Sequence, residues 1–380
     1  MENLTHTLVG LAAAKAGLER TSPYATATCL VAANLPDADI VTLVAGPSVY
    51  LEQHRGVSHS IAGTLALGLL LPAVVYAVAR LAARLRGRPP RARFKGLLIS
   101  SLLVTATHPL LDWTNSYGVR PWLPWSGEWV YGDLVFIVDP WLWLLLGGAC
   151  FLAASETPRR AALWAALGLL LTAALVFLPR RMNAGIPTAA YVVWFAGLGL
   201  FVAARLFDLP ARWGRAIPSA ALALVVAYWG GLALVHRRAL EWGRFAAADL
   251  AAGRGERVET IAAMPLLADP LAWRYAFETD RATWRFDSRV TGATLDGVEE
   301  SDVRNLVRVE KPSGADGALV EQAAGDERAR VLLDFARFPV ARLRRGCVGE
   351  VIVQFSDLRF TEPGRNSRGG SFSLEVPVRR

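Results

Sequence analysis

The chain has 380 residues, of which 53% are hydrophobic and 19% are charged. A soluble globular protein is normally less apolar, so this composition favours an integral membrane protein. The formal net charge is +8, but the basic residues cluster beside apolar runs, as they do in loops that orient membrane proteins, and we expect no nucleic-acid partner.

Two short helices are predicted at the N-terminus, over residues 4–19 and 23–33. Pro23 suits the first turn of the second helix, and Asn34-Leu35-Pro36 should end it. Arms of about 15 residues are short for a membrane span, so this hairpin is either re-entrant or packed inside a bundle. We expect no signal peptide, because no basic segment or cleavage site is present.

Apolar segments follow the hairpin. They cover residues 60–83, 95–111, 134–154, 161–179, 187–205 and 216–235. Uncharged runs of about 20 residues can cross a hydrocarbon core of about 30 Å. We therefore predict an α-helical integral membrane bundle of roughly six spans plus the N-terminal short helical hairpin, in contact with the lipid bilayer. The aromatic segment 113–133 is interpreted as an interfacial belt or as a loop that lines a substrate site.

The character of the sequence changes after Val235. A charged amphipathic helix is predicted over residues 237–255. Short alternating runs then predict strands at residues 273–279, 283–290, 331–338, 351–360 and 372–378, with turns at Asp316-Gly317 and Pro363-Gly364. We expect a transmembrane domain over residues 1–236 and a soluble, β-rich α+β domain over residues 237–380, which is a lid, a scaffold or a partner surface. The three cysteines lie far apart and are expected to be free thiols: Cys29, Cys150 and Cys347.

Four polar motifs lie at the edges of the apolar segments. They are Thr5-His6, Asn34-Leu35-Pro36-Asp37-Ala38-Asp39, His54-Arg55-Gly56-Val57-Ser58-His59-Ser60 and His108-Pro109-Leu110-Leu111-Asp112. Histidine and aspartate are common ligands of hydrolytic metals, and ionisable residues near a bilayer are usually functional. Antiparallel helices joined by short loops would bring all four motifs to one membrane face. The predicted metal ligands are His6, Asp37, His59, His108 and Asp112.

Three neighbouring residues are candidates for catalysis. Asp39 or His54 is a candidate general base, or a group that orients a ligand. Arg55 suits a phosphate oxygen through bidentate hydrogen bonds, but a salt bridge to Asp37, Asp39 or Glu52 is an equal alternative. Asp139, before Pro140, is either a helix N-cap or a distal ligand.

The order of these motifs resembles the YdjM-type family of membrane-bound, predicted metal-dependent hydrolases, over about residues 1–140. The Thr5-His6 start and the His108-x-x-x-Asp112 pair are also similar to the zinc-dependent phospholipase C and P1-type nuclease pattern. The later ligands of that pattern have no counterpart, because no histidine lies between His108 and His236. The resemblance implies one or two divalent ions, zinc or manganese, rather than three.

These observations predict a membrane-bound metal-dependent hydrolase that acts on a phosphoester or a lipid headgroup through metal-activated water. The alternative is a membrane scaffold or stress-linked binding protein with a structural metal. The basic loop 84–95 should face the cytoplasm of a bacterial inner membrane, which would place the metal site and the C-terminal domain outside. The sequence does not predict an oligomeric state.

Overall fold

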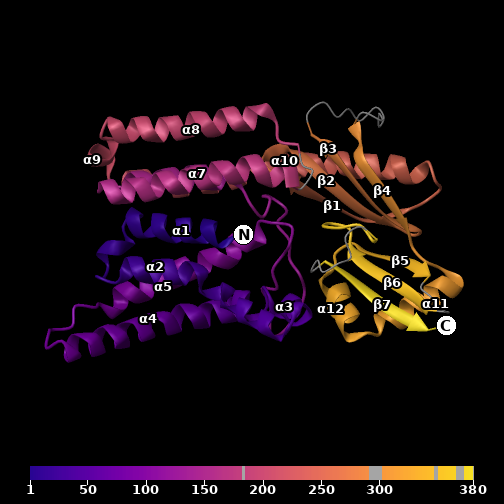
Figure 1. Ribbon diagram of the computed structural model, residues 1–380, viewed down its shortest axis with the longest axis horizontal. Coiled ribbons are helices and arrows are strands. Elements are labelled where there is room, and N and C mark those ends of the chain that lie inside the picture. Colours follow the sequence, from indigo (N-terminus) through magenta and orange to yellow (C-terminus); the bar gives the residue numbers. More distant parts are fainter. Residues whose placement is uncertain (182–184, 291–301, 346–349, 365–371, 380) are drawn as a thin grey trace. The chain divides into compact units, whose positions relative to one another are not determined.

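Helices form the first part of the chain and two antiparallel sheets form the last (Figure 1). The computed structural model describes residues 1–181, 185–290, 302–345, 350–364 and 372–379. The chain divides into two units. The first comprises residues 1–38, 55–233 and 266–269, and the second comprises residues 39–54, 234–265 and 270–380. The division between domains at residue 236 stays a prediction.

Short helices begin the chain. They are α1 (Asn3–Ala16), η1 (Leu18–Arg20), α2 (Ala25–Asn34), η2 (Leu35–Ala45), α3 (Pro47–Gln53) and η3 (Val57–His59). As predicted, the second α-helix stops at Asn34 before Pro36. The chain then continues as a 3-10 helix, so that Ala25–Ala45 is long and apolar enough to cross a membrane.

Long apolar helices follow. They are α4 (Ile61–Leu85), α5 (Phe94–Trp113), α6 (Pro140–Ala154), α7 (Pro158–Arg181), α8 (Thr188–Leu206), α9 (Leu209–Trp213) and α10 (Ala216–Ala252). Among the residues that the structure describes, six helical segments have the length and composition of a membrane span, as predicted. Their identity differs from the prediction, because Ala25–Ala45 is among them while Pro140–Ala154 is too short. These helices place the protein in contact with the lipid bilayer.

The N-terminus of α6 explains why this helix is shorter than the predicted apolar segment. Asp139 is an N-cap, since its Oδ1 accepts hydrogen bonds from the backbone N–H groups of Trp141 (2.8 Å) and Leu142 (3.1 Å). Its Oδ2 accepts a further bond from the Tyr228 hydroxyl at 3.0 Å. The cap alternative for Asp139 is therefore confirmed. Residues 134–139 form the connection to α6, which is why that helix is shorter than the predicted apolar segment.

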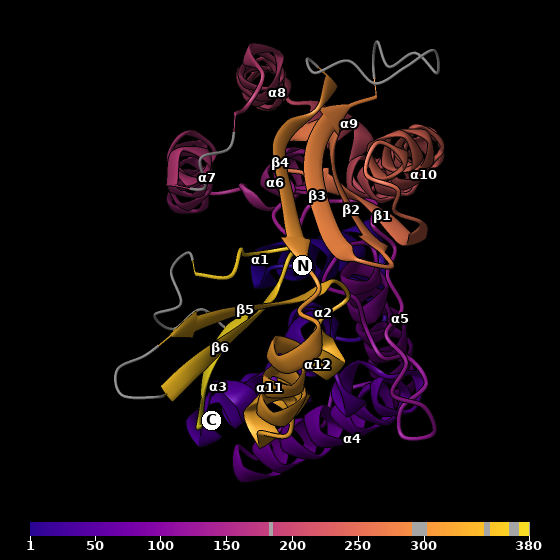
Figure 2. The same ribbon diagram turned by 90° about the vertical axis from the view of Figure 1, so that its right-hand side faces the viewer.

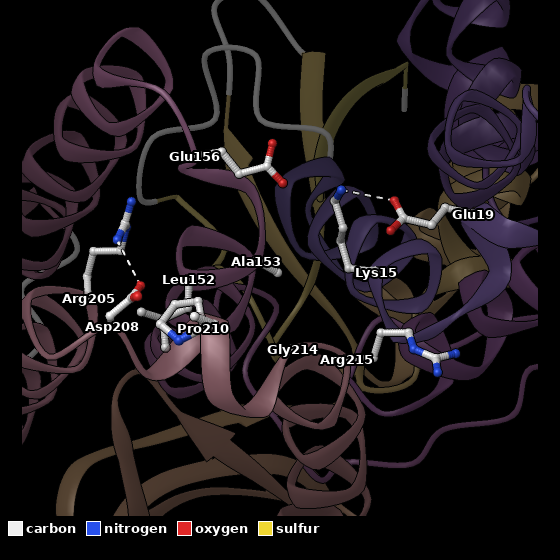
Figure 3. A pocket seen from close by; sticks show the side chains of 11 residues that line it. Lys15, Glu19, Leu152, Ala153, Glu156, Arg205, Asp208, Pro210, Gly214 and Arg215 are labelled. Carbon is white, nitrogen blue, oxygen red and sulfur yellow. Dashed lines mark ion pairs between the residues drawn. The ribbon is translucent and has the colours of Figure 1, made fainter.

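Charged side chains gather at the end of α1 away from His6. They line a hollow of about 420 Å³ between the ends of α1, α6 and α8 (Figure 3). Lys15 pairs with Glu19 at 2.9 Å, and Arg205 with Asp208 at 3.8 Å. Such paired charges are suited to a boundary between membrane and water.

Gly96 in α5 is expected to be intolerant of a larger residue. A Cβ atom at this position would lie 2.2 Å from the backbone oxygen of Thr21. We expect Gly96→Ala to destabilise the protein by about 1–3 kcal/mol through overpacking, measured by thermal unfolding in detergent. Gly230→Ala is the matched control, since no atom lies within 4 Å of its added Cβ, and it should be neutral or stabilising. Equal unfolding temperatures for the two variants would contradict this packing.

The second unit contains two sheets. The first has the order β1 (Val258–Leu266), β2 (Asp269–Thr279), β3 (Ala282–Arg289), β4 (Arg304–Glu310). The second has the order β5 (Pro339–Arg345), β6 (Glu350–Asp357), β7 (Ser373–Arg379). The C-terminal part of α10 lies along the first sheet (Figure 2), and its Trp242 packs against Tyr275 and Phe286. Tyr275 and Phe286 are cross-strand partners with stacked rings 4.8 Å apart.

Several predictions for this unit are corrected. The amphipathic helix predicted at 237–255 is continuous with the preceding span, as α10. The predicted strand 331–338 is wrong, because α12 (Glu327–Phe335) occupies most of it and is capped by Asp326. Asp316-Gly317 lies inside α11 (Gly314–Ala324) and not in a turn. Strands β1, β4 and β5 were not predicted. Cys29 and Cys150 are buried free thiols, and Cys347 lies outside the described residues.

Candidate metal centre

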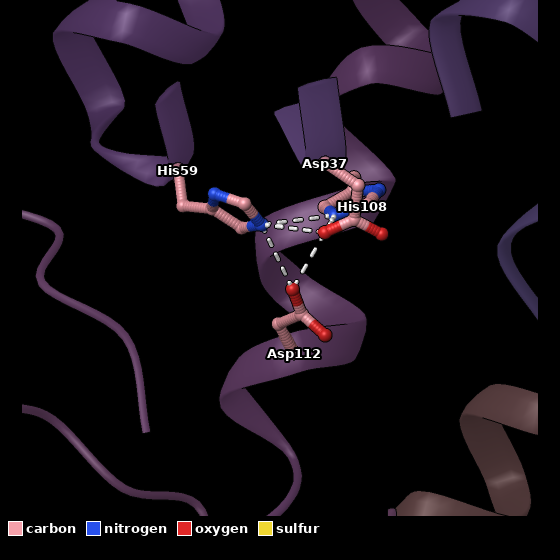
Figure 4. Close-up of side chains that lie close together, drawn as sticks. All are labelled: Asp37, His59, His108 and Asp112. Carbon is pink, nitrogen blue, oxygen red and sulfur yellow. Dashed lines mark hydrogen bonds and ion pairs between the residues drawn. The ribbon is translucent and has the colours of Figure 1, made fainter. Parts of the chain in front are cut away.

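Four side chains from three segments point toward one another (Figure 4). Asp37 comes from the 3-10 helix η2 that follows α2, and His59 ends the short helix η3 just before α4. His108 and Asp112 lie one turn apart near the end of α5, which continues through Pro109. The structure thus brings together four of the five predicted metal ligands.

The facing atoms of these four residues are evenly spaced. The Nε2 atoms of His59 and His108 are 3.1 Å apart. Asp37 Oδ1 lies 3.3 Å from His59 Nε2 and 3.4 Å from His108 Nε2. Asp112 Oδ2 lies 3.2 and 3.3 Å from the same two nitrogens. Both histidine side chains are fully buried, Asp112 is 1% exposed and Asp37 is 15% exposed.

Hydrogen bonds on the outer side of this group orient its members. His108 Nδ1 lies 2.6 Å from the backbone oxygen of Ala33, and His59 Nδ1 lies 3.0 Å from the hydroxyl of Ser58. An Nδ1–H that donates to a carbonyl leaves the Nε2 lone pair of His108 facing inward. Asp37 Oδ2 accepts a hydrogen bond of 3.0 Å from Asn3.

Asp112 is held by its second oxygen. Arg55 Nη2 lies 3.0 Å from Asp112 Oδ1, and the amino group of Met1 contacts the same oxygen. Arg55 is 2% exposed, and its Nη1 donates to Asn115 Oδ1 at 3.0 Å. Its guanidinium lies 4.5 Å from the ring centroid of Tyr117. Arg55 therefore forms a salt bridge with Asp112, which follows it in the sequence.

The fifth predicted ligand, His6, lies beside the group. Its ring stacks on that of His108 with centroids 3.7 Å apart, and its Nε2 is 3.4 Å from Asp112 Oδ1. That oxygen faces away from the other three donors. Burial lowers the pKa of His6 to about 4, so the imidazole is neutral near pH 7 and keeps a lone pair. A role for His6 as a ligand stays a prediction.

Asp39 and His54 are paired in the second unit. Asp39 Oδ1 lies 3.1 Å from His54 Nδ1, and the His54 ring stacks on Tyr50 with centroids 4.7 Å apart. A carboxylate beside Nδ1 orients an imidazole and sets its tautomer. Their catalytic role stays a prediction.

The donor set fits a divalent ion. A tetrahedral site with bonds of about 2.0–2.1 Å has edges of about 3.3–3.4 Å between neighbouring ligand atoms. The contact between the two Nε2 atoms and the four contacts between these nitrogens and the carboxylate oxygens are 3.1–3.4 Å, and the two carboxylate oxygens lie within 4.8 Å of each other. Without an ion, one of the two Nε2 atoms would carry a proton and donate it to the other in a hydrogen bond of 3.1 Å. Nitrogen and oxygen donors suit zinc or manganese.

Known proteins resemble the N-terminal, helical part of this chain in sequence. Residues 1–183 match the family model described as YdjM inner membrane protein. The predicted resemblance to that family is confirmed for this region. It contains every predicted metal ligand and all three predicted catalytic residues, because the last of them in the sequence is Asp112.

The chain is similar to the "Uncharacterized protein YfhP" of Bacillus subtilis (strain 168), with 29% identity over 154 residues. The aligned part is 38% of this chain and 43% of YfhP, so the chain spans less than half of that relative. No solved structure matches. The similarity to the zinc-dependent phospholipase C pattern stays a prediction.

Sequence reasoning missed the residues around the ligands. Ser58, Ala33 and Asn3 bind the outer atoms of the ligand side chains, while Asn115 and Tyr117 hold Arg55. The contact of Ser58 with His59 could have been predicted, because the two residues are adjacent in the sequence. The contacts of Ala33 and Asn3 have no local signal, because they depend on how α1, α2 and α5 pack.

Proposed function

We propose that the protein is a membrane-bound metal-dependent hydrolase that acts on a phosphoester or a lipid headgroup. The observation that carries this proposal is the convergence of Asp37, His59, His108 and Asp112 within a YdjM-like membrane region. Buried ionisable groups in a membrane protein are costly, and they are normally retained for function.

The four donor residues would have different roles in binding the metal and the substrate. A bound divalent ion would supply a water of lowered pKa and an electrophile for a phosphoryl oxygen. His59, His108 and Asp112 are almost fully buried and would hold such an ion, while Arg55 keeps Asp112 charged and oriented. Asp37 is the most exposed of the four, at 15%, and is therefore the ligand that substrate or water can displace from the metal. Asp39 with His54 is proposed as the base or orienting pair.

A structural metal is the second candidate function. Four protein donors close a tetrahedral site, and closed sites are typical of structural zinc. The β-rich unit would then carry the function of a membrane scaffold or binding protein. The two candidates differ in whether substrate turnover requires the metal.

The test is metal analysis combined with substrate hydrolysis. Full-length protein in detergent is analysed by inductively coupled plasma mass spectrometry and assayed with phosphatidylethanolamine, phosphatidylglycerol and a soluble phosphodiester. We expect about one or two zinc or manganese ions per chain, and hydrolysis that a chelator abolishes and the metal restores. Stoichiometric metal without hydrolysis would favour the structural candidate, and the absence of metal would overturn both.

The orientation is also proposed. The connection between α4 and α5, residues 86–93, is at the opposite end of these helices from His59 and His108. It contains Arg86, Arg88, Arg91 and Arg93. By the positive-inside rule this end faces the cytoplasm, and the metal centre and the C-terminal unit face outside.

A further inference from the structure

Each carboxylate of the candidate metal centre has one oxygen that faces the two histidines and one that is held elsewhere. Asp112 Oδ1 is bound by Arg55 at 3.0 Å, which leaves Oδ2 toward the histidines. Asp37 Oδ1 also faces the histidines, while its Oδ2 points away from them (Figure 4) and accepts a hydrogen bond of 3.0 Å from Asn3 Nδ2. Each carboxylate would therefore offer a metal ion one oxygen.

The two carboxylates are held by different kinds of group. Arg55 is charged and 2% exposed, so its contact with Asp112 is part of the protein interior. Asn3 is neutral and exposed, on the first turn of α1. Within the described part of the chain, Asn3 is the residue that donates to Asp37 Oδ2. The position of the Asp37 carboxylate therefore depends on a single side chain that can be changed without opening the core.

Neighbouring polar groups fix which end of the Asn3 amide meets Asp37. Asn34 Nδ2 donates to the backbone oxygen of Leu30 and to Thr7 Oγ1, each at 3.0 Å. The amide oxygen of Asn34 therefore faces Asn3, whose Nδ2 lies 3.5 Å away. A carboxylate only accepts hydrogen bonds, so the same Nδ2 is the group that Asp37 requires.

The hydroxyl of Thr7 completes this arrangement. A hydroxyl has one hydrogen, and the nearest acceptor of Thr7 is the backbone oxygen of Asn3 at 2.7 Å. The Oδ1 atom of Asn34 is farther away, at 3.3 Å. Thr7 therefore donates to Asn3 and accepts from Asn34, which keeps the donor end of the Asn34 amide turned away from Asn3.

The number of oxygens that the carboxylates offer decides which divalent ion fits. Two imidazole nitrogens and one oxygen from each carboxylate make four donors, the number that zinc takes in tetrahedral sites. Manganese prefers six ligands, with carboxylate and water oxygens among them. A second oxygen from Asp37 would be a fifth donor, and would make the set more suitable for manganese.

We propose that Asn3 positions Asp37 as a ligand through one oxygen and thereby makes the centre selective for zinc over manganese. Asn34 and Thr7 contribute by fixing the orientation of the Asn3 amide. This inference rests on the proposed function and selects one of its two metals. Asn3 is a positioning residue, since it acts through Asp37 and not on the substrate.

Asn3→Ala tests the proposal, because substitutions at exposed positions usually change stability little. Asn305→Gly is the matched control. Asn305 Nδ2 also donates to an aspartate oxygen at 3.0 Å, Asp287 Oδ2, but lies in the second unit. Glycine suits its φ of 51°. Zinc affinity is measured by competition with a fluorescent chelator and manganese affinity by electron paramagnetic resonance, on full-length protein in detergent that has been stripped of metal.

The zinc affinity of Asn3→Ala should fall about 10–100-fold, the usual loss when a group that orients a ligand is removed. Manganese affinity should fall less, because the freed oxygen of Asp37 adds a donor that manganese can use. The ratio of zinc to manganese affinity therefore falls, while Asn305→Gly keeps both affinities. An unchanged ratio in Asn3→Ala would overturn the proposal, including an equal loss of both affinities with a lowered unfolding temperature, which a purely structural role predicts.

Thr7 tests the orientation of the amide without touching Asp37. Thr7→Val keeps the shape of the side chain and loses the hydroxyl, whereas Thr7→Ser keeps the hydroxyl. We expect Thr7→Val to lower the ratio of zinc to manganese affinity by a smaller factor than Asn3→Ala, and Thr7→Ser to behave like the wild type. Equal ratios in the two Thr7 variants would overturn the role of Thr7.

The wild-type protein separates this proposal from the proposed function. Zinc-loaded wild type that hydrolyses no substrate would overturn the proposed function, while a lowered affinity ratio in Asn3→Ala would still support the role of Asn3. Wild type that binds manganese more tightly than zinc would overturn the selectivity proposal alone. Wild type that binds neither metal would overturn both.

Discussion

Replacing His108 with alanine is expected to abolish stoichiometric metal binding and, with it, hydrolysis. His108 Nε2 lies 3.1 Å from His59 Nε2 and within 3.4 Å of both carboxylates. The substitution therefore removes one of the four candidate metal ligands. Loss of a group outside the ligand shell typically weakens metal binding about 10–100-fold, and loss of a ligand should weaken it more. Metal content is measured by inductively coupled plasma mass spectrometry on protein purified in detergent.

His236→Ala is the control for the His108 substitution. This imidazole lies in the second unit, where its Nε2 is 3.1 Å from the backbone oxygen of Ala263, and its loss should leave the metal content unchanged. His108→Gln serves if the alanine variant fails to fold, because it keeps a polar side chain of similar size. A folded His108 variant with full metal content would show that the ligand set is wrong.

The candidate site was largely predictable from the sequence because its ligands lie at helix ends. His108 and Asp112 are four residues apart, so a continuous helix brings them to one face. The apolar length of the following segments fixes which helix ends meet at one membrane face. His59 and Asp37 are therefore placed near the same end without knowledge of the packing.

The partner of Arg55 was not predictable in the same way. Its φ of 55° lies in the left-handed region, which is uncommon for a residue other than glycine. This local conformation accompanies a contact with Asp112, which lies 57 residues later in the chain. Sequence spacing carries no information on such a turn.

The β-rich unit was predicted less well than the helices. Its segments are short, and a run such as Val331-Leu332-Leu333 fits a strand or a buried helix face equally well. Asp326, which caps α12, was the signal that could have decided for a helix. Long apolar spans have no such ambiguity, because their length alone distinguishes them from strands.

Replacing Arg55 with methionine is expected to destabilise the protein by about 3–5 kcal/mol, the usual effect of removing one partner of a buried ion pair. Arg55 is 2% exposed and Asp112 is 1% exposed, so water cannot replace the lost guanidinium. The carbonyl of Gly118 and the side chain of Asn115 also lose their donor. The measurement is the unfolding temperature in detergent, with and without a chelator, and the loss should be greater without metal because a bound cation also compensates Asp112.

A double variant distinguishes a positioning role for Arg55 from direct contact with substrate. If Arg55 mainly stabilises Asp112, adding Asp112→Asn to Arg55→Met should cost less than the two single effects together, by about 0.5–3 kcal/mol. Arg55→Lys should recover only part of the stability, because Nη1 and Nη2 bind different partners and a single ammonium cannot replace both. An Arg55→Met variant that unfolds like the wild type but has a raised KM for phosphoester substrates would contradict the positioning role. It would favour the alternative in which the guanidinium binds a phosphate oxygen.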